Sequence, residues 1–170
     1  YEIVKKSEII DAEPVNLLLL GLDKDRTRSD VIMLINFNPA KGKLNILSIA
    51  RDTKVLLNGK PVKINSLIGT GGEEAVSRTV SEITGLPIHY YATLDFEGFK
   101  KIIDTLGGVE YEVPFDMDYD DPEQNLHIHL SSGLQVLDGD KAEQFVRYRK
   151  GYTDADIGRI KAQQDFLKAL

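Results

Sequence analysis

The feature that most constrains the fold is an almost continuous apolar run near the start of the chain, Val15–Leu20, which ends at Gly21. Six residues are too few for a helix and show no polar alternation, so the run predicts a buried β-strand. Two similar runs, Asp30–Asn36 and Leu44–Ile49, flank the turn sequence Pro39-Ala40-Lys41-Gly42. They predict a β-hairpin that follows the first strand.

The rest of the chain alternates between strand and helix patterns. Helices are expected from Gly71 to the stop at Gly85, from Asp95 to Gly107-Gly108, over Gly139–Val146 and over Thr153–Leu170, where Thr153 and Asp156 form a capping box. Strands are expected at Ile88–Thr93, Val109–Val113 and Leu126–Leu130, with an extended Pro61–Asn65 and an acidic loop over Asp116–Asn125. The pattern predicts a single α/β domain over residues 1–170, a three-layer α/β/α arrangement with a central mixed sheet.

Composition narrows the classes of function. The net charge is −6 and the chain has no cysteine. An acidic protein lacks the basic footprint of a nucleic-acid binder, so no nucleic-acid partner is expected. Disulfides and thiolate chemistry are excluded. The sequence also has no apolar run of about 18 residues, the length that a membrane-spanning helix requires.

The arginines are concentrated, whereas the lysines are scattered. Six of the seven arginines lie in four short polar segments, and Arg78 is the exception, on the exposed face of a predicted helix. Arginine presents a rigid fork of donors that matches a phosphate group in a bidentate manner. The concentration therefore points to a phosphate-rich anion.

The first segment runs from Asp23 to Asp30 and contains Arg26 and Arg28. Asp23 follows one predicted strand and Asp30 begins the next, so their carboxylates can meet at one end of an antiparallel pair. Two carboxylates beside phosphate suit Mg²⁺, which fills its remaining positions with water and phosphate oxygens. The alternative is a charged loop with solvated ion pairs.

The second segment, Ser48–Thr53, ends a mostly apolar strand, so Arg51 should emerge at the sheet edge where ligands of open α/β sheets collect. The alternative is a strand-end arginine that pairs with Asp52. The third segment contains Arg147 and Arg149. The helical apolar pattern stops at Val146, so we expect an extended chain there that points both arginines the same way. Two guanidinium groups without a neighbouring carboxylate favour an anion between them.

The fourth segment places Arg159 and Gln163 on one face of the last helix, one turn after Asp156. That face is expected to lie beside a core stripe of Ile157, Ile160 and Leu167. His127 and His129 alternate along a strand and share a face, so they are either solvent-facing histidines or a metal pair. His89 is expected to be structural.

Taken together and in order, these segments resemble the extracellular catalytic domain of the LytR–CpsA–Psr family across the whole chain. The matching segments are Gly21–Asp23, Arg28–Asp30, Ser48–Thr53, Lys63–Asn65, Gly71–Glu73, Asp95–Phe99, Asp104–Val109, Gly133–Gly139, Val146–Arg149 and Asp154–Gln164.

The resemblance implies a phosphotransferase that moves a glycopolymer from a polyprenyl pyrophosphate carrier onto peptidoglycan as a phosphodiester. Wall teichoic acid or a capsular or secondary wall polysaccharide is the implied cargo. The implied location is the extracytoplasmic face of the membrane of a Gram-positive-type bacterium, with an anchor before residues 1–14, which would be a membrane-proximal lead-in. The lipid would run into an apolar tunnel between the sheet and the helices.

The resemblance also assigns residues. The implied pyrophosphate ligands are Arg28, Arg51, Lys63, Arg147, Arg149, Arg159 and Gln163. Asp23 and Asp30 would hold Mg²⁺. Our mechanistic hypothesis, beyond the resemblance, is a catalytic set of Arg51, Asp30, Arg147 and Arg149, with Asp30 as the carboxylate that takes the acceptor's proton. The alternatives are a polyprenyl-phosphate binding module without transfer, a hydrolase that releases the polymer to water, and a surface of ion pairs without a site.

Overall fold

The structure, a computed structural model, describes residues 13–23, 25–124, 126–152 and 156–170. The chain divides into two compact units, Tyr1–Asp95 and Phe96–Leu170. Most of the predicted lead-in and the Thr153 end of the predicted capping box lie outside the described residues. The organisation of residues 1–170 as one domain stays a prediction.

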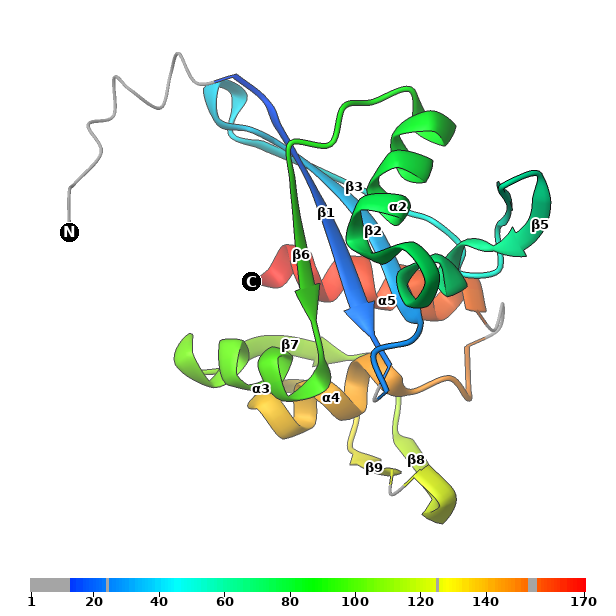
Figure 1. Cartoon of the computed structure of the whole chain (residues 1–170). Coiled ribbons are helices and arrows are strands. Elements are labelled where there is room, and N and C mark those ends of the chain that lie inside the picture. Colours follow the sequence, from blue (N-terminus) through cyan, green and yellow to red (C-terminus); the bar gives the residue numbers. More distant parts are fainter. Residues whose placement is uncertain (1–12, 24, 125, 153–155) are drawn as a thin grey trace. The chain divides into compact units, whose positions relative to one another are not determined.

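A four-stranded sheet forms the first unit, in the order β3-β2-β1-β6 (Figure 1). Its strands are β1 (Val15–Leu22), β2 (Ser29–Asn38), β3 (Lys43–Ser48) and β6 (Tyr90–Leu94). β2 is antiparallel to β1 and β3, whereas β6 is parallel to β1. The predicted α/β fold with a central mixed sheet is confirmed, as is the hairpin whose turn is the 3₁₀ segment Pro39–Lys41.

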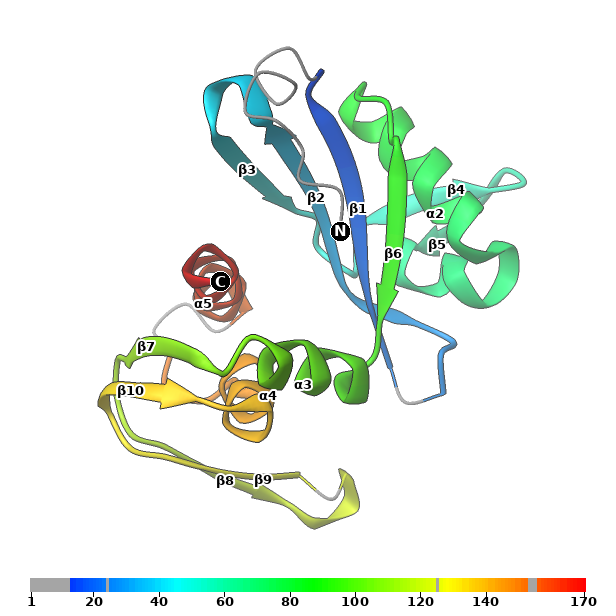
Figure 2. The same ribbon diagram turned by 90° about the vertical axis from the view of Figure 1, so that its left-hand side faces the viewer.

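Helix α2 (Leu67–Thr84) covers one face of this sheet, as Figure 2 shows. Leu18 and Leu20 on β1 pack with Val76 and Val80 on the helix, and all four side chains are fully buried. The predicted stop is confirmed, since Gly85 is the left-handed C-cap. The chain is already helical from Leu67, and a kink at Gly72, whose φ of 66° suits glycine, separates this first segment from the helix that the sequence predicted to open at Gly71.

Two shorter strands of the first unit, β4 (Lys54–Leu57) and β5 (Lys60–Lys63), form a hairpin. The extended Pro61–Asn65 prediction covers most of β5, although Ile64–Ser66 is a 3₁₀ turn. Strand β4 was not predicted. Asn58 and Gly59 both have positive φ at the turn, as a tight hairpin connection requires.

A row of asparagine amides crosses the sheet. Asn36 Nδ2 donates to Asn16 Oδ1 at 2.7 Å, and Asn45 Nδ2 donates to Asn36 Oδ1 at 3.3 Å. Asn16 is 6% exposed, and its amide also donates to the carbonyl of Pro87. The backbone N–H of Asn16 donates to His89 Nδ1 at 2.8 Å, so the prediction of a structural His89 is confirmed.

The second unit combines two strand pairs with three helices. β7 (Val109–Val113) pairs with β10 (Gly133–Leu137), and β8 (Met117–Asp121) pairs with β9 (Leu126–Leu130). The helices are α3 (Phe96–Thr105), α4 (Gly139–Arg147) and α5 (Asp156–Ala169). In Figure 2, β8 and β9 continue the β7–β10 pair as a long hairpin.

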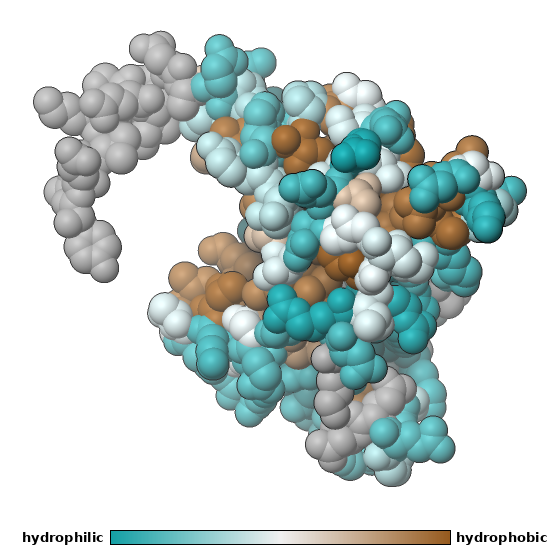
Figure 3. Space-filling view, in the orientation of Figure 1, coloured by the Kyte–Doolittle hydropathy of each residue, from teal (hydrophilic) through white to brown (hydrophobic). Residues whose placement is uncertain are grey.

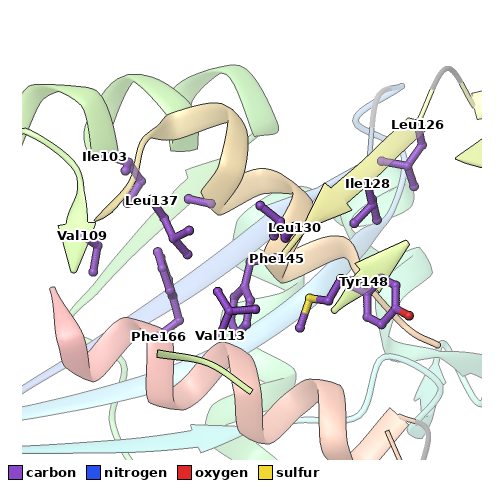
Figure 4. Close-up of a cluster of buried hydrophobic side chains, with 12 residues drawn as sticks. Ile103, Val109, Val113, Leu126, Ile128, Leu130, Leu137, Phe145, Tyr148 and Phe166 are labelled. Atoms are coloured by element: carbon purple, nitrogen blue, oxygen red, sulfur yellow. The ribbon is translucent and has the colours of Figure 1, made fainter. Parts of the chain in front are cut away.

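An aromatic core holds the second unit together. Phe145 of α4 and Phe166 of α5 are buried, with ring centroids 5.6 Å apart. Tyr111 of β7 contacts both rings, at 4.8 Å and 5.4 Å. Figure 4 shows Phe145 and Phe166 among aliphatic side chains of this cluster, including Val113 and Leu137.

Two sequence predictions for this unit are wrong, and one strand was not predicted. Residues 117–121 of the predicted acidic loop form β8, with Met117 buried. Strand β10 was missed altogether. The predicted stripe on α5 is also wrong, since Ile157 is 69% exposed while Phe166 is buried.

Candidate functional site

The predicted sheet edge gathers charged residues of the first unit. Strands β1, β3 and β6 run in the same direction, so their carboxyl ends share one edge, where the β1 and β6 arrowheads point in Figure 1. At this edge lie five of the predicted site residues: Asp23, Arg28, Asp30, Arg51 and Lys63.

Asp23 organises the loop between β1 and β2. Its Oδ1 accepts the backbone N–H groups of Thr27 at 2.8 Å and Arg28 at 3.1 Å. Its Oδ2 lies 3.6 Å from Arg28 Nε. The loop approaches the first turn of α2, since a Cβ on Gly69 would meet the Thr27 carbonyl oxygen at 2.8 Å. Asp23 therefore holds the backbone that presents Arg28.

Asp30 and Arg51 form an ion pair at this edge. Arg51 Nη1 donates to Asp30 Oδ1 at 2.8 Å, and both side chains are partly exposed, at 31% and 42%. The sequence had offered Asp52 as the alternative partner of Arg51. The structure brings Arg51 to Asp30 because Ile49 N–H donates to the Ile32 carbonyl, which continues the β2–β3 alignment past Ser48.

Lys63 reaches the same edge from β5. Its Nζ lies 2.7 Å from Asp52 Oδ1, and this hydrogen bond holds the pKa of Asp52 below its usual value. Backbone hydrogen bonds tie the segments together, from Ile64 N–H to the Thr53 carbonyl and from Asn65 N–H to the Arg51 carbonyl. The Arg51–Asp30 and Lys63–Asp52 pairs are thus joined through the backbone and are not isolated charges.

The sheet face opposite α2 is apolar. The side chains on this face include Leu17 and Leu19 of β1, paired with Ile35 and Met33 of β2. Phe37 on the same face is 47% exposed. An apolar surface of one sheet therefore extends back from an edge rich in guanidinium and carboxylate groups.

Arg147, in the second unit, has a carboxylate partner that the sequence analysis overlooked. Its Nη1 lies 2.7 Å from Glu143 Oε1, and its guanidinium stacks 4.7 Å from the ring centre of Phe96. The premise that Arg147 has no neighbouring carboxylate is wrong. The i,i+4 spacing of Glu143 and Arg147 was the signal that could have shown it.

The expected extension of the chain begins one residue later than predicted. Arg147 is the last residue of α4, and Tyr148 has an extended conformation with φ −65° and ψ 134°. Tyr148 is buried, whereas Arg149 is exposed and its charge acts on Tyr119. These contacts place Arg147 and Arg149 beside different residues, so the paired-guanidinium argument loses its basis, and their role as anion ligands stays a prediction.

Arg159 and Gln163 lie on the inner face of α5. Arg159 is 9% exposed, and Gln163 Nε2 donates to the Val146 carbonyl at 2.9 Å. The carbonyl belongs to the last turn of α4, so Gln163 connects the two helices. Phe166 shares this face, which explains why the polar pair lies on the core side of the helix rather than beside it.

The carboxylates of Asp23 and Asp30 suit the predicted Mg²⁺. They are hard oxygen ligands, Asp23 directly after β1 and Asp30 near the start of β2, and Mg²⁺ needs only one or two carboxylates when phosphate and water complete its shell. Asp30 is 42% exposed at its side chain, so its carboxylate is open to a ligand.

Among the described residues, no helix is long and apolar enough to cross a membrane.

Known proteins resemble the chain over almost all of its length. It is 33% identical to the polyisoprenyl-teichoic acid–peptidoglycan teichoic acid transferase TagV of Bacillus subtilis, with 97% of the chain and 45% of TagV covered. It is 37% identical to the transferase TagU of Bacillus mycoides, with 98% and 55% covered. A structure of TagT with bound octaprenyl pyrophosphate lipid matches with a TM-score of 0.75 and 27% identity, covering 94% of the chain and 64% of TagT.

The chain thus spans about half the length of these two transferases. The model of the LytR_cpsA_psr family matches residues 2–170, which is nearly the entire chain. Sequence, fold and family match agree, and the protein belongs to the LytR_cpsA_psr family.

Proposed function

We propose that this protein transfers a glycopolymer from a polyprenyl pyrophosphate carrier to peptidoglycan. The observation that carries the proposal is the Arg51–Asp30 pair at the edge of a sheet whose face opposite α2 is apolar. An anionic head group fits the arginine and lysine side chains at this edge, and a polyprenyl chain fits the apolar face. The names of TagV and TagU as teichoic acid transferases support the reaction, and the lipid bound to TagT supports the donor.

The reaction is a phosphoryl transfer. A hydroxyl oxygen of peptidoglycan attacks the phosphorus that carries the glycan, the bond from that phosphorus to the bridging oxygen breaks, and polyprenyl phosphate leaves. Asp30 accepts the proton of the hydroxyl group. Arg28, Arg51 and Lys63 stabilise the charge that grows on the phosphoryl oxygens, which is the main catalytic demand of such transfers.

Mg²⁺ belongs to this proposal as the cofactor held by Asp23 and Asp30, where it would neutralise the pyrophosphate oxygens. Asp23 already fixes the loop through two backbone N–H groups, so it orients Arg28 whether or not a cation is present.

Arg147, Arg149, Arg159 and Gln163 remain predicted ligands of the same anion. For Arg147, an anion must compete with Glu143. Lys100 Nζ lies 3.7 Å from Glu143 Oε2, so the carboxylate keeps a cationic neighbour when Arg147 turns to a phosphate. Lys100 therefore lowers the free energy needed to move the Arg147 side chain from Glu143 to a phosphate group.

The proposed location is the extracytoplasmic face of the cell membrane of a Gram-positive-type bacterium. The acceptor, peptidoglycan, lies on that side, and TagV comes from Bacillus subtilis. Wall teichoic acid is the cargo that the relatives' names favour over capsular or other secondary wall polysaccharides.

The test is a transfer assay with a polyprenyl pyrophosphate glycan, peptidoglycan oligomers and Mg²⁺. Transfer yields a glycan joined to peptidoglycan by a phosphodiester, hydrolysis yields a glycan with a free phosphate end, and a binding module yields neither product. We expect the phosphodiester, and its absence with active donor and acceptor would refute the proposal.

Variants test the assigned residues in the same assay. Arg51→Ala should lower the rate by about 100-fold or more, the scale of losing one charge-stabilising donor. Arg78→Ala is the matched control, because Arg78 lies exposed on α2 away from the sheet edge. A rate for Arg51→Ala equal to that of the control would remove Arg51 from the catalytic set. Asp23→Asn and Asp30→Asn should each raise the Mg²⁺ concentration needed for half-maximal rate.

A further inference from the structure

The outward face of the β8–β9 hairpin carries two histidines directly opposite two aspartates. In the strand register, Asp118 faces His129 and Asp120 faces His127. All four side chains lie on the same side of the hairpin, because residues two apart along a strand share a face. The sequence analysis had left this histidine pair open between solvent exposure and metal binding.

Three of these side chains converge at the atoms that can bind a metal. One ligand atom from each of Asp120, His127 and His129 lies within 4.8 Å of the other two. His127 Nδ1 lies 2.5 Å and His129 Nε2 lies 3.4 Å from the same oxygen, Asp120 Oδ1. Two ligands of a tetrahedral Zn²⁺ ion are separated by about 3.4 Å, so small side-chain adjustments would complete the geometry.

The fourth side chain supports the arrangement. Asp118 Oδ1 lies 2.8 Å from His129 Nδ1. A carboxylate that accepts the Nδ1 proton fixes the tautomer in which Nε2 is free to bind a metal, and this is the usual outer partner of a histidine ligand. His129 therefore has one nitrogen oriented by Asp118 and the other directed at Asp120.

The backbone beneath the cluster is well anchored. The opposite face of the hairpin buries Met117, Ile128 and Leu130 in the core of the second unit. The backbone N–H of His129 donates to Gln144 Oε1 at 2.8 Å, which ties β9 to α4. The two strands thus hold the ligands at a spacing that does not depend on a loop.

The donor set selects the kind of ion. Two imidazoles and a carboxylate suit Zn²⁺ and similar transition metals, whereas Mg²⁺ prefers oxygen ligands alone. Asp116, directly before β8, adds negative charge that favours a cation. In Figure 3 the surface of this hairpin is mainly hydrophilic, and the side chains of His127 and His129 are 56% and 58% exposed, so an ion can enter directly.

We propose that Asp120, His127 and His129 form a binding site for a divalent transition-metal ion, with Zn²⁺ as its reference occupant and a water molecule in the fourth position. Asp118 is the positioning residue of this site. The site shares no residue with the carboxylates that we assign to Mg²⁺, and it does not rest on the proposed transferase activity.

The experiment is calorimetric titration of ZnCl₂ into chelator-treated protein without a histidine tag, in buffer with millimolar MgCl₂. We expect one Zn²⁺ ion per chain with a dissociation constant in the micromolar range. Titration with Co²⁺ should give the intense visible absorption of a four-coordinate ion. A wild-type protein that binds no Zn²⁺ at 100 micromolar would overturn the proposal, and the aspartates and histidines would then be only surface ion pairs.

Substitutions locate the ion. The double variant His127→Gln/His129→Gln should weaken Zn²⁺ binding by more than about 100-fold, and Asp118→Asn by about 10-fold, the lower end of the effect of losing an outer partner. Glu112→Gln, an exposed acid on β7, is the matched control and should bind as the wild type does. Unchanged Zn²⁺ binding in the double variant would place the ion elsewhere. Arg51→Ala should retain the site, which separates this test from that of the transferase.

Discussion

Tyr152 has a buried hydroxyl group without a hydrogen-bond partner among the described residues. Its ring packs against Phe115, with centroids 5.2 Å apart, and against Tyr148 at 6.3 Å. It also abuts α5, because a Cβ on Gly158 would meet Tyr152 Cβ at 2.6 Å. The ring contributes to packing, whereas burial removes the hydroxyl oxygen from water without a hydrogen bond to replace that contact.

We expect Tyr152→Phe to keep or increase the free energy of unfolding, by up to about 1 kcal/mol, because the ring contacts remain and an unsatisfied polar group is removed. Urea denaturation at pH 7 measures the effect. Tyr148→Phe serves as the comparison, since that ring belongs to the same aromatic group. A loss of more than about 1 kcal/mol in Tyr152→Phe would mean that the hydroxyl has a partner that stabilises it.

The same residue predicts a pH dependence. Burial raises the pKa of Tyr152 to about 12, above the value of about 10 expected in the unfolded chain. The stability that the neutral form contributes is therefore complete below pH 10 and is lost as the pH rises toward 12. Urea denaturation at pH 9, 10.5 and 11.5 should show a decline that is smaller in Tyr152→Phe. Part of the decline should persist, because burial also raises the pKa of Tyr111.

Helix packing in the second unit depends on a close approach between α3 and α4. A Cβ on Gly139 would lie 2.6 Å from the Lys100 carbonyl oxygen, and the Gly139 N–H donates to Asp104 Oδ1 at 2.8 Å. The first residue of α4 thus rests directly on the backbone of α3. Only a residue without a side chain permits this contact.

We expect Gly139→Ala to lower the free energy of unfolding by about 1–3 kcal/mol, the usual effect of forcing extra volume into a packed contact. Thermal and urea denaturation measure it. Lys141→Ala is the control on the same helix, because Lys141 is exposed and contributes its backbone N–H, not its side chain, to the cap made by Asp138. Equal stability of the two variants would show that α4 shifts to accept the methyl group.

At the scale of elements, sequence patterns predicted the bounds correctly where a segment had a clear strand alternation or a helix-ending glycine. Strands β7 and β9 have the bounds that their alternation predicted, and Gly85 ends α2 as expected. Strand β8 was missed because its outward aspartates suggested a loop, although Met117 and Tyr119 alternate with them. The buried face of α5 was misjudged because Ile157 is more apolar than Arg159, yet contact with the aromatic core decides which face is buried.

At the scale of the molecule, each unit has its own hydrophobic cluster. Ile64 belongs to the cluster of the first unit and Ile103 to that of the second, and both side chains are fully buried. The two residues provide matched positions for the same substitution. Phe145 and Phe166, by contrast, lie in one cluster and contact each other.

We expect Ile64→Val and Ile103→Val each to cost about 1 kcal/mol and to add within about 0.5 kcal/mol in the double variant. In the double variant of Phe145→Leu and Phe166→Leu, the change in the free energy of unfolding should differ from the sum of the single changes by more than about 0.5 kcal/mol. The reason is that each single substitution already removes the contact between the two rings. Urea denaturation of the single and double variants measures both cycles. A large coupling between the two isoleucines would show that the two clusters respond as one.

The candidate site was predictable in part. Strand ends and hairpin order were enough to gather Asp23, Asp30 and Arg51 at one sheet edge. The partner of each charge was not predictable, because Arg51 pairs with Asp30 rather than with its neighbour Asp52, through a strand alignment that the sequence does not state. Helix α4 extends one residue beyond the apolar pattern and includes Arg147. Arg147 therefore lies one turn after Glu143 and forms an ion pair with it.

The asparagine row across β1, β2 and β3 has a consequence for the order in which the first sheet assembles. Asn36 and Asn45 are separated by only nine residues, so their hydrogen bond can form as soon as the hairpin closes. Asn16 must then meet Asn36, and His89 joins only after a loop of 73 residues has closed onto it. Because early closure of short loops costs less entropy, the hairpin would nucleate the sheet and β6 would dock last. Each amide that is already in place offers the next strand a single alignment. The row would therefore fix the register of each strand at the moment when that strand joins the sheet.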